Sequence, residues 1–107
     1  MWSETMGGFK AIAVAGFDRT VIRCEGELDV GQCAKLIDML DRVFEDEVER
    51  LVVDLSDVTF IDSTGIGCLL HGAFKAEKLS VAFEVLPGRA VERFLSVSGL
   101  SPYLSVS

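Results

Sequence analysis

The chain has few basic residues and no run of them. It carries 10 Lys and Arg against 17 Asp and Glu, which gives a formal net charge of -7. Binding to nucleic acid depends on Lys and Arg that displace counterions from phosphates, so this composition argues against a nucleic-acid partner. An acidic surface of this kind suits a protein partner that is basic.

Long apolar segments are absent as well. No stretch reaches the length of about 20 apolar residues that a membrane-spanning helix requires. The short run Ala11–Gly16 has the small residues of a signal-peptide end, but Glu4 precedes it and a basic region does not. We therefore expect a cytoplasmic protein without a membrane partner.

Cysteine is scarce, with Cys24, Cys33 and Cys68 as the complete set. An odd number at irregular spacing gives neither a disulfide framework nor a zinc-binding pattern. The sequence predicts buried thiols in a reducing cytosol. A redox-sensing pair formed by Cys24 and Cys33 is the alternative interpretation.

The patterns typical of cofactor-binding and catalytic sites are missing too. Gly65 and Gly67 begin a dinucleotide-binding motif whose third glycine would fall on Leu70. His71, the only histidine, is close to Cys68 in sequence, but a nucleophilic pair also needs a third, orienting group. We expect a surface or boundary histidine and a protein that is not an enzyme, with no cofactor and no metal.

Acidic residues crowd one short region, at Asp54, Asp57 and Asp62. Such a group could indicate a metal site or a phosphoaspartate like that of a receiver domain. A receiver also needs an acid pair after its first strand and a lysine late in the chain, whereas the last lysine here is Lys78. Because Asp readily accepts hydrogen bonds from nearby backbone N–H groups, the sequence favours turn-capping roles for these acids.

The chain does contain segments with strand-like apolar patterns that alternate with segments of helical apolar spacing. Its length predicts a single domain over residues 1–107, in which residues 1–8 are flexible. Strands are expected at residues 10–15, 20–25, 50–55 and 80–86, with a further edge strand at 103–106. The first two form a hairpin, and the third, nearly unbroken in its apolar residues, should be covered on both faces.

Helical spacing predicts three helices between and after these strands. Asp29 is the expected N-cap of a first helix of about 16 residues. Its apolar face comprises Cys33, Leu36, Ile37, Leu40 and Phe44. A second helix begins near Ser63, with Lys75 and Lys78 outward and a buried stripe of Ile66, Leu69, Leu70, Ala73 and Phe74. The third carries Val91, Phe94 and Leu95 and stops at Gly99. The order β-β-α-β-α-β-α, with an optional last strand, predicts an α/β fold with a mixed sheet.

The segment Leu51–Leu70 carries the strongest functional signal. An apolar strand leads through a loop with the three acids to Ser63 and Thr64, which fall in the first turn of the expected second helix. No Glu or Gln follows at the capping-box position, so we expect the N–H groups of this turn to be partly open. A helix N-terminus favours anions, and a hydroxyl there suits phosphorylation, although simple helix capping by Asp62 or Ser63 is the alternative.

Gly65 and Gly67 add to this signal, because each costs on the order of 1 kcal/mol relative to Ala in a helix interior. Either close packing on a strand or close approach by a partner would offset that cost, and the sequence does not separate the two.

Three blocks of the chain resemble the STAS family, which includes bacterial anti-sigma-factor antagonists and the regulatory domains of sulfate transporters. The blocks are Gly26–Asp29, Leu51–Leu70 and Val91–Leu100. The central block is the most specific, through Phe60-Ile61-Asp62-Ser63-Thr64-Gly65-Ile66-Gly67. The resemblance implies a single STAS-like domain and covers nearly everything from Lys10 to Val106.

The resemblance also implies a function. In antagonists of this family the serine directly after that aspartate is phosphorylated, and here it is Ser63. The unphosphorylated form would bind an anti-sigma factor that is also a serine kinase, and so free a sigma factor in transcription regulation or stress response. A PP2C-type phosphatase would reset the switch. We expect a monomer or weak dimer whose partner-binding residues are Glu27, Asp29, Asp62, Ser63, Thr64 and Gly65.

A second interpretation keeps the same fold without the switch. A STAS scaffold or a transport-associated binding module would bind its partner without phosphorylation. The hydroxyl pair, Ser63 and Thr64, does not discriminate between the two, because either class can keep it.

Overall fold

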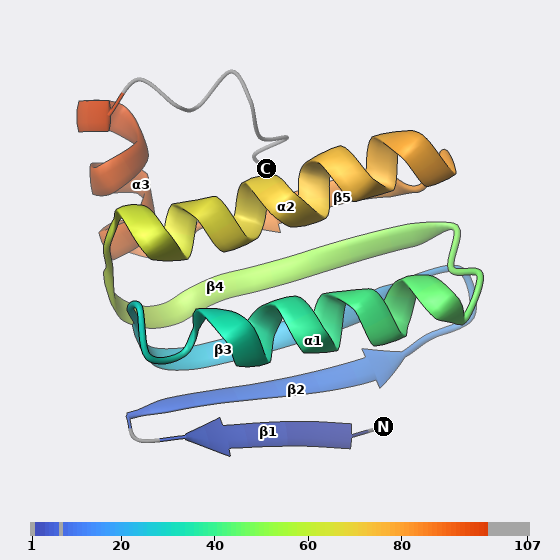
Figure 1. Ribbon diagram of the computed structural model, residues 1–107, viewed down its shortest axis with the longest axis horizontal. Helices are drawn as coiled ribbons and strands as arrows, with labels where there is room; N and C mark the ends of the chain where they lie inside the picture. The colour runs from blue at the N-terminus through green and yellow to red at the C-terminus, as the bar shows by residue number, and fades with distance from the viewer. Residues whose placement is uncertain (1, 7, 99–107) are drawn as a thin grey trace.

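The sheet of the computed structural model has its five strands in the order of the chain (Figure 1). The structure describes residues 2–6 and 8–98. The strands are β1 (Trp2–Met6), β2 (Phe9–Ala15), β3 (Thr20–Leu28), β4 (Arg50–Ile61) and β5 (Ala82–Leu86). Strands β1, β2 and β3 pair antiparallel, whereas β4 pairs parallel with both β3 and β5. The predicted α/β fold with a mixed sheet is confirmed.

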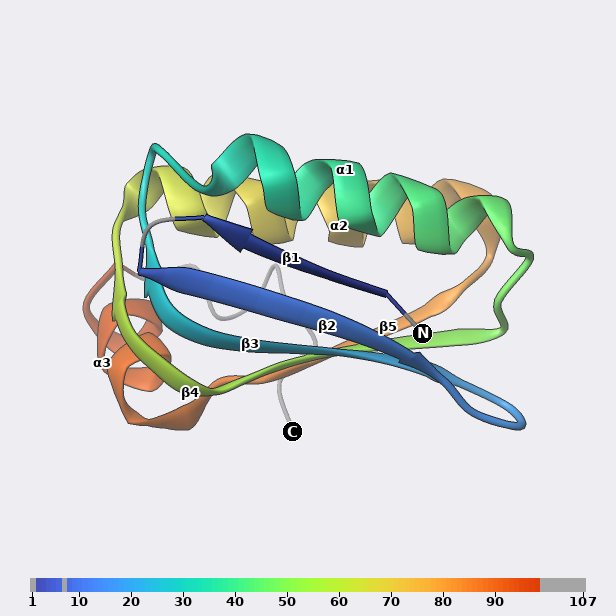
Figure 2. The same cartoon turned by 90° about the horizontal axis from the view of Figure 1, so that it is seen from below.

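Three helices complete the part of the chain that the structure describes: α1 (Cys33–Glu45), α2 (Ser63–Leu79) and α3 (Gly88–Ser98). Helices α1 and α2 lie side by side on one face of the sheet, and α3 packs against β4 near one end of it (Figure 2). None of these helices is both long and apolar enough to cross a membrane. The expected helix stop at Gly99 and the strand at 103–106 lie outside the described residues.

Two strands differ from the sequence prediction. No strand was predicted before residue 10, but Trp2–Met6 form the edge strand β1, paired with β2. The flexibility expected of residues 1–8 stays a prediction. The third predicted strand, 50–55, continues to Ile61 in β4. It continues because the second half of β4 still pairs with β3, through Glu25 and Asp57 and through Leu28 and Ile61. Asp54 and Asp57 therefore belong to a strand and not to the loop that the sequence suggested.

Gly26 lies in β3 at a point where the backbone of Gly8 comes very close. Its φ of 97° is a left-handed backbone conformation, and a Cβ added there would lie 1.7 Å from the carbonyl oxygen of Gly8. Only glycine fits such an approach. The pairing between β3 and β4 shifts register between Gly26 and Glu27, as at a β-bulge.

The prediction that Asp29 caps the first helix is wrong. Helix α1 begins at Cys33, and its N-cap is Gln32, whose side chain makes no capping hydrogen bond. The Asp29 carboxylate instead accepts a hydrogen bond from Gly31 N–H at 3.0 Å. Asp29 thus stabilises its own turn in the loop between β3 and α1, as Asp often does.

The hydrophobic core lies between the sheet and the pair α1 and α2. Residues of every element from β2 to α3 contribute to it, and their most buried members include Ile22, Leu28, Leu36, Leu40, Leu51, Leu55, Leu69 and Val85. The predicted apolar stripe of α2 is buried at Ile66 and Leu69 but not at Phe74, which is 54% exposed. The buried face of α2 continues through Gly72 and Ala76, and position 74 lies on another side of the helix.

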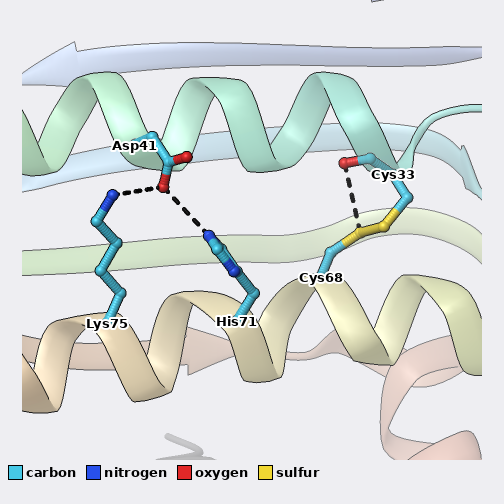
Figure 3. A network of polar contacts seen from close by, with 5 residues as sticks. All are labelled: Cys33, Asp41, Cys68, His71 and Lys75. Atoms are coloured by element: carbon cyan, nitrogen blue, oxygen red, sulfur yellow. Dashed lines mark hydrogen bonds and ion pairs between the residues drawn. A yellow bond between two sulfur atoms is a disulfide. The ribbon is translucent and has the colours of Figure 1, made fainter.

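Two sets of contacts join α1 directly to α2 (Figure 3). Cys33 and Cys68 form a disulfide, so the prediction of three free thiols is wrong for these two; Cys24 is free and buried. Further along, Asp41 Oδ1 accepts a hydrogen bond from Lys75 Nζ at 2.9 Å and lies 3.2 Å from His71 Nε2.

The second set also corrects one detail of α2. Lys75, expected to point outward, reaches across to α1, while His71 is partly exposed at the boundary as predicted. Burial acts to raise the pKa of Asp41, but the hydrogen bonds from Lys75 and His71 outweigh it and hold the pKa below its ordinary value.

Candidate functional site

Ser63 is the first residue of α2, and its position follows from where two parallel strands end. Leu28 and Ile61 are paired at the ends of β3 and β4, and Asp62 and Ser63 come directly after Ile61. Ligand and partner sites of parallel sheets commonly form at this edge. The side chains of Ser63 and Thr64 are exposed. The hydroxyl is therefore open to an approaching protein.

Asp62 determines how α2 begins. Its backbone is extended (φ -120°, ψ -173°), as expected for an N-cap. Its Oδ1 accepts hydrogen bonds from the N–H of Thr64 at 3.0 Å, from the N–H of Gly65 at 3.1 Å and from the Thr64 hydroxyl at 2.5 Å. Of the N–H groups of this turn that were expected to be partly open, those of Thr64 and Gly65 are both satisfied by the cap residue.

These hydrogen bonds also affect the charge of the site. The Thr64 hydroxyl and then the Gly65 N–H favour the carboxylate, so the pKa of Asp62 lies below its ordinary value. Asp62 is therefore ionised at neutral pH. A negative charge is held in the residue directly before Ser63, and a second anion added there would be repelled by it.

The two glycines of this turn have different roles, which the sequence left open. A Cβ added to Gly65 would lie 2.7 Å from the carbonyl oxygen of Leu28 and 2.7 Å from Ile61 Cγ1. Gly65 is thus required by close packing of α2 on the ends of β3 and β4. A Cβ added to Gly67 meets no heavy atom of the described residues within 4 Å. Gly67 is an exposed bare position, where a partner's surface could come close.

Glu27 and Asp29 flank Leu28, the residue whose carbonyl contacts the Gly65 position. Glu27 is exposed and pairs with Phe60 across β3 and β4, while Asp29 is half-buried in its own turn. The Glu27 carboxylate lies near Gly8, toward the turn before β2. The structure therefore gathers Asp62, Ser63, Thr64 and Gly65 in one helical turn, with Glu27 and Asp29 on the neighbouring strand end and loop.

Asp54 and Asp57 do not join this turn. The Asp54 carboxylate accepts hydrogen bonds from Ser56 N–H at 3.0 Å and from the Ser56 hydroxyl at 2.5 Å. Its other oxygen lies 3.8 Å from Arg23 Nε. Asp57 pairs with Glu25 within the sheet. Asp54 thus has the local capping role that the sequence favoured.

Two exposed apolar side chains lie at the same edge of the sheet as Ser63. Neither was predicted from the sequence as a site residue. Phe60 is 48% exposed at the end of β4, and Val30 is 72% exposed in the loop that follows Leu28. Exposed apolar groups at the centre of a polar rim are typical of protein–protein interfaces. No pattern in the sequence indicated Phe60. A strand with strict alternation buries one of two successive side chains, but in β4 Thr59 and Phe60 are both exposed.

The fold and the site can be compared with those of known proteins. A structure with the same fold is that of an anti-sigma factor antagonist from Mycobacterium paratuberculosis, at 26% identity over 92% of this chain and 84% of that chain, with a TM-score of 0.82. The chain belongs to the STAS family, since the family model described as Mlab, STAS domain, matches residues 13–105.

The anti-sigma factor antagonist SpoIIAA has the same fold in two forms. Its unphosphorylated form is 22% identical, over 91% of this chain and 87% of that chain, with a TM-score of 0.74. Its phosphorylated form, from Bacillus, is 22% identical over 91% and 90%, with a TM-score of 0.69. A search of curated protein sequences found no match to this chain.

Proposed function

We propose that this protein is an anti-sigma-factor antagonist switched by phosphorylation of Ser63. Its unphosphorylated form binds an anti-sigma factor that is also a serine kinase and so releases the sigma factor. Phosphorylation ends that binding, and a PP2C-type phosphatase restores it. The protein is the substrate in this cycle and performs no catalysis of its own.

The observation that carries the proposal is the exposed Ser63 hydroxyl at the start of α2, beside a cap that is already complete. The N–H groups of Thr64 and Gly65 already donate to Asp62. A phosphate on Ser63 would therefore not bind them and would face outward. The likeness to antagonist structures, one of them in a phosphorylated form, supports the same assignment.

The surface around Ser63 supports a protein partner. Phe60 and Val30 supply exposed apolar area, and Glu27, Asp29 and Asp62 supply a negative rim. The whole chain is acidic at -7, which favours a partner with a basic surface at this edge. Gly67 leaves room for close approach along α2.

The switch then acts on association rather than on folding. A phosphate adds about -1.5 to -2 charge, and a helix N-terminus tolerates it. Next to the ionised Asp62, the added charge acts on the interface, where like charges brought together cost several kcal/mol. Since each 1.4 kcal/mol is about tenfold in affinity, we expect phosphorylation to weaken binding about 100-fold or more.

The test mixes the full chain with its candidate anti-sigma factor and ATP. The intact mass should rise by one phosphate that maps to Ser63, and Ser63→Ala should abolish that rise while it keeps binding. Ser63→Asp should weaken binding. Ser80→Asp is the matched control, because it adds the same charge at the other end of α2.

Two outcomes would contradict the proposal. A phosphate that maps to another residue would remove Ser63 as the switch. A Ser63→Asp variant that binds as tightly as the wild type would instead favour a STAS module that binds its partner without phosphorylation.

A further inference from the structure

The disulfide between Cys33 and Cys68 lies next to the turn that carries Ser63. Cys33 is the first residue of α1, and Cys68 is in the second turn of α2. Their Cα atoms are 5.9 Å apart, within the usual range for a disulfide, so the two helices are already placed for the bond. The residues are separated by 35 positions in the chain, so the bond joins two distant segments.

The surroundings of the two sulfur atoms also suit the reduced form. Cys33 Sγ lies 3.4 Å from the carbonyl oxygen of Thr64, and Cys68 Sγ lies 3.5 Å from the carbonyl oxygen of Cys33. A disulfide has no hydrogen to donate, so these are contacts in the oxidised form. In the dithiol form the two sulfur atoms must move apart, and these carbonyl oxygens are nearby acceptors for the S–H groups. Reduction therefore leaves polar partners close to both thiols.

The three cysteines differ in reactivity. Cys33 is partly exposed at the first residue of α1, whereas Cys68 is fully buried. Burial, with a smaller contribution from Asp54, raises the pKa of the Cys24 thiol to about 12. Cys24 therefore stays protonated and inert, and Cys33 is the accessible member of the bonded pair.

We propose that Cys33 and Cys68 form a reversible thiol–disulfide site oxidised by hydroperoxides, and that the disulfide holds the surface around Ser63 in order. The redox site stands on the geometry of the two cysteines. Its effect on partner binding rests on the proposed function of Ser63.

The chemistry balances with a hydroperoxide as the oxidant. The Cys33 thiolate attacks one peroxide oxygen, the O–O bond breaks, and Cys33 becomes a sulfenic acid while the other oxygen leaves as water or alcohol. The Cys68 sulfur then attacks the Cys33 sulfur, the S–O bond breaks, and the S–S bond forms with release of water. The two thiols lose two electrons and two protons, and an external dithiol reverses the reaction by exchange.

The position of the bond predicts a local effect. It ties the start of α1, and with it the loop that contains Asp29 and Val30, to α2 just after Ser63. The other link between the helices, from Asp41 to His71 and Lys75, lies further along both helices (Figure 3). Reduction should therefore loosen the end of the helix pair that carries Ser63 and leave the other end joined.

The redox site is tested on the reduced full chain with hydrogen peroxide. The intact mass should fall by two hydrogen atoms, and peptide mapping should find only the bond between Cys33 and Cys68. Cys24→Ala is the matched control and should oxidise like the wild type, while Cys33→Ser and Cys68→Ala should not form the bond. A dithiol that peroxide leaves unchanged, or bonds that involve Cys24, would overturn the proposal.

The ordering effect is tested by hydrogen exchange of the oxidised and reduced chain. Amides of residues 30–36 and 64–69 should exchange at least about 10-fold faster after reduction, while those near Asp41 and His71 change less. Equal exchange in the two forms would overturn the ordering role. This measurement needs no partner.

Binding to the anti-sigma factor links the two proposals. The oxidised form should bind about 3- to 10-fold more tightly, because its surface is ordered in advance. Equal affinity of both forms would overturn the redox link and leave the Ser63 switch intact. Failure of both forms to bind would instead contradict the proposed function, and the oxidation and exchange results would still decide the redox site.

Discussion

The two helices that cover one face of the sheet begin in different ways. Helix α2 starts at a well-formed cap, in which one oxygen of Asp62 accepts hydrogen bonds from Thr64 and Gly65. Helix α1 starts at Gln32, whose side chain makes no capping hydrogen bond and whose Oε1, within the described residues, is buried without a partner. The first residue of α1, Cys33, is instead held by its disulfide to Cys68 of α2.

This difference shows that one helix start can have a fixed geometry while the geometry of the neighbouring helix start can change. The start of α2 is determined by residues adjacent in sequence, so it presents Ser63 in one geometry. The start of α1 depends on a bond to a distant residue, so a change of oxidation state alters it. A local cap cannot be switched in that way.

The largest expected effect comes from opening the disulfide. With its ends 35 residues apart, the bond should stabilise the fold by about 3 to 4 kcal/mol in the chain-entropy model. Denaturant unfolding of the wild type, with and without a dithiol, measures this difference. Cys33→Ser should unfold at the same midpoint under both conditions, and a wild type that is insensitive to the dithiol would contradict the role we give to the bond.

The next effect separates the two glycines of α2. Gly65→Ala should destabilise the fold by about 1 to 3 kcal/mol, because its Cβ would press on backbone and on a core side chain. Gly67→Ala, in open space, should stabilise it by about 0.5 to 1 kcal/mol through better helix propensity. Thermal unfolding of the two variants measures whether each one stabilises or destabilises the fold. A stabilising Gly65→Ala would show that the packing of α2 on Leu28 is looser than described.

A smaller effect compares the two helix starts directly. Asp62→Ala should cost about 1 kcal/mol, because it removes a cap that satisfies two N–H groups. Gln32→Ala should be neutral or slightly stabilising, because it removes a buried oxygen without a partner. If both substitutions cost the same in chemical denaturation, the contrast between the two starts would be lost.

The smallest effect is on pH dependence. The folded-state pKa of Asp62 lies below its ordinary value, as does that of Asp41, so the unfolded chain binds protons at a higher pH than the folded chain. The stability that these groups provide is fully present above about pH 4 to 5 and is lost as pH falls through their lower folded values.

Unfolding midpoints measured from pH 6 down toward acid should therefore decline for the wild type below roughly pH 4. Asp62→Asn should reduce that decline by removing one of the two contributions. An unchanged slope in the variant would show that the Asp62 carboxylate contributes nothing to it.

Much of the fold was predictable because it depends on short-range pattern. Alternating residues predicted the hairpin of β2 and β3, and helical spacing predicted α1, α2 and α3. The start of α2 near Ser63 was predicted, with Asp62 or Ser63 as the possible cap, and the structure shows that Asp62 is the cap. Asp29 has the same chemistry, and the prediction failed there because its carboxylate bonds to Gly31 instead.

The remainder depended on neighbours distant in the chain. The β4 strand extends to Ile61 because β3 is there to pair with it, and Trp2–Met6 form a strand because β2 offers its edge. Phe74 fits a helical stripe in sequence, but the packed face of α2 runs through Gly72 and Ala76 and leaves Phe74 exposed. No local pattern contains that information.

The amino-acid sequence by itself determined the order of strands and helices from β2 to α3 and put an Asp-Ser-Thr turn at the junction of β4 and α2, because both follow from residues close together in the chain. Only the tertiary structure decided that Gly65 is packed and Gly67 is open, and that Cys33 pairs with Cys68 rather than with Cys24. Those outcomes depend on which segments meet in space, and close approach between distant residues is a property of the packed fold alone.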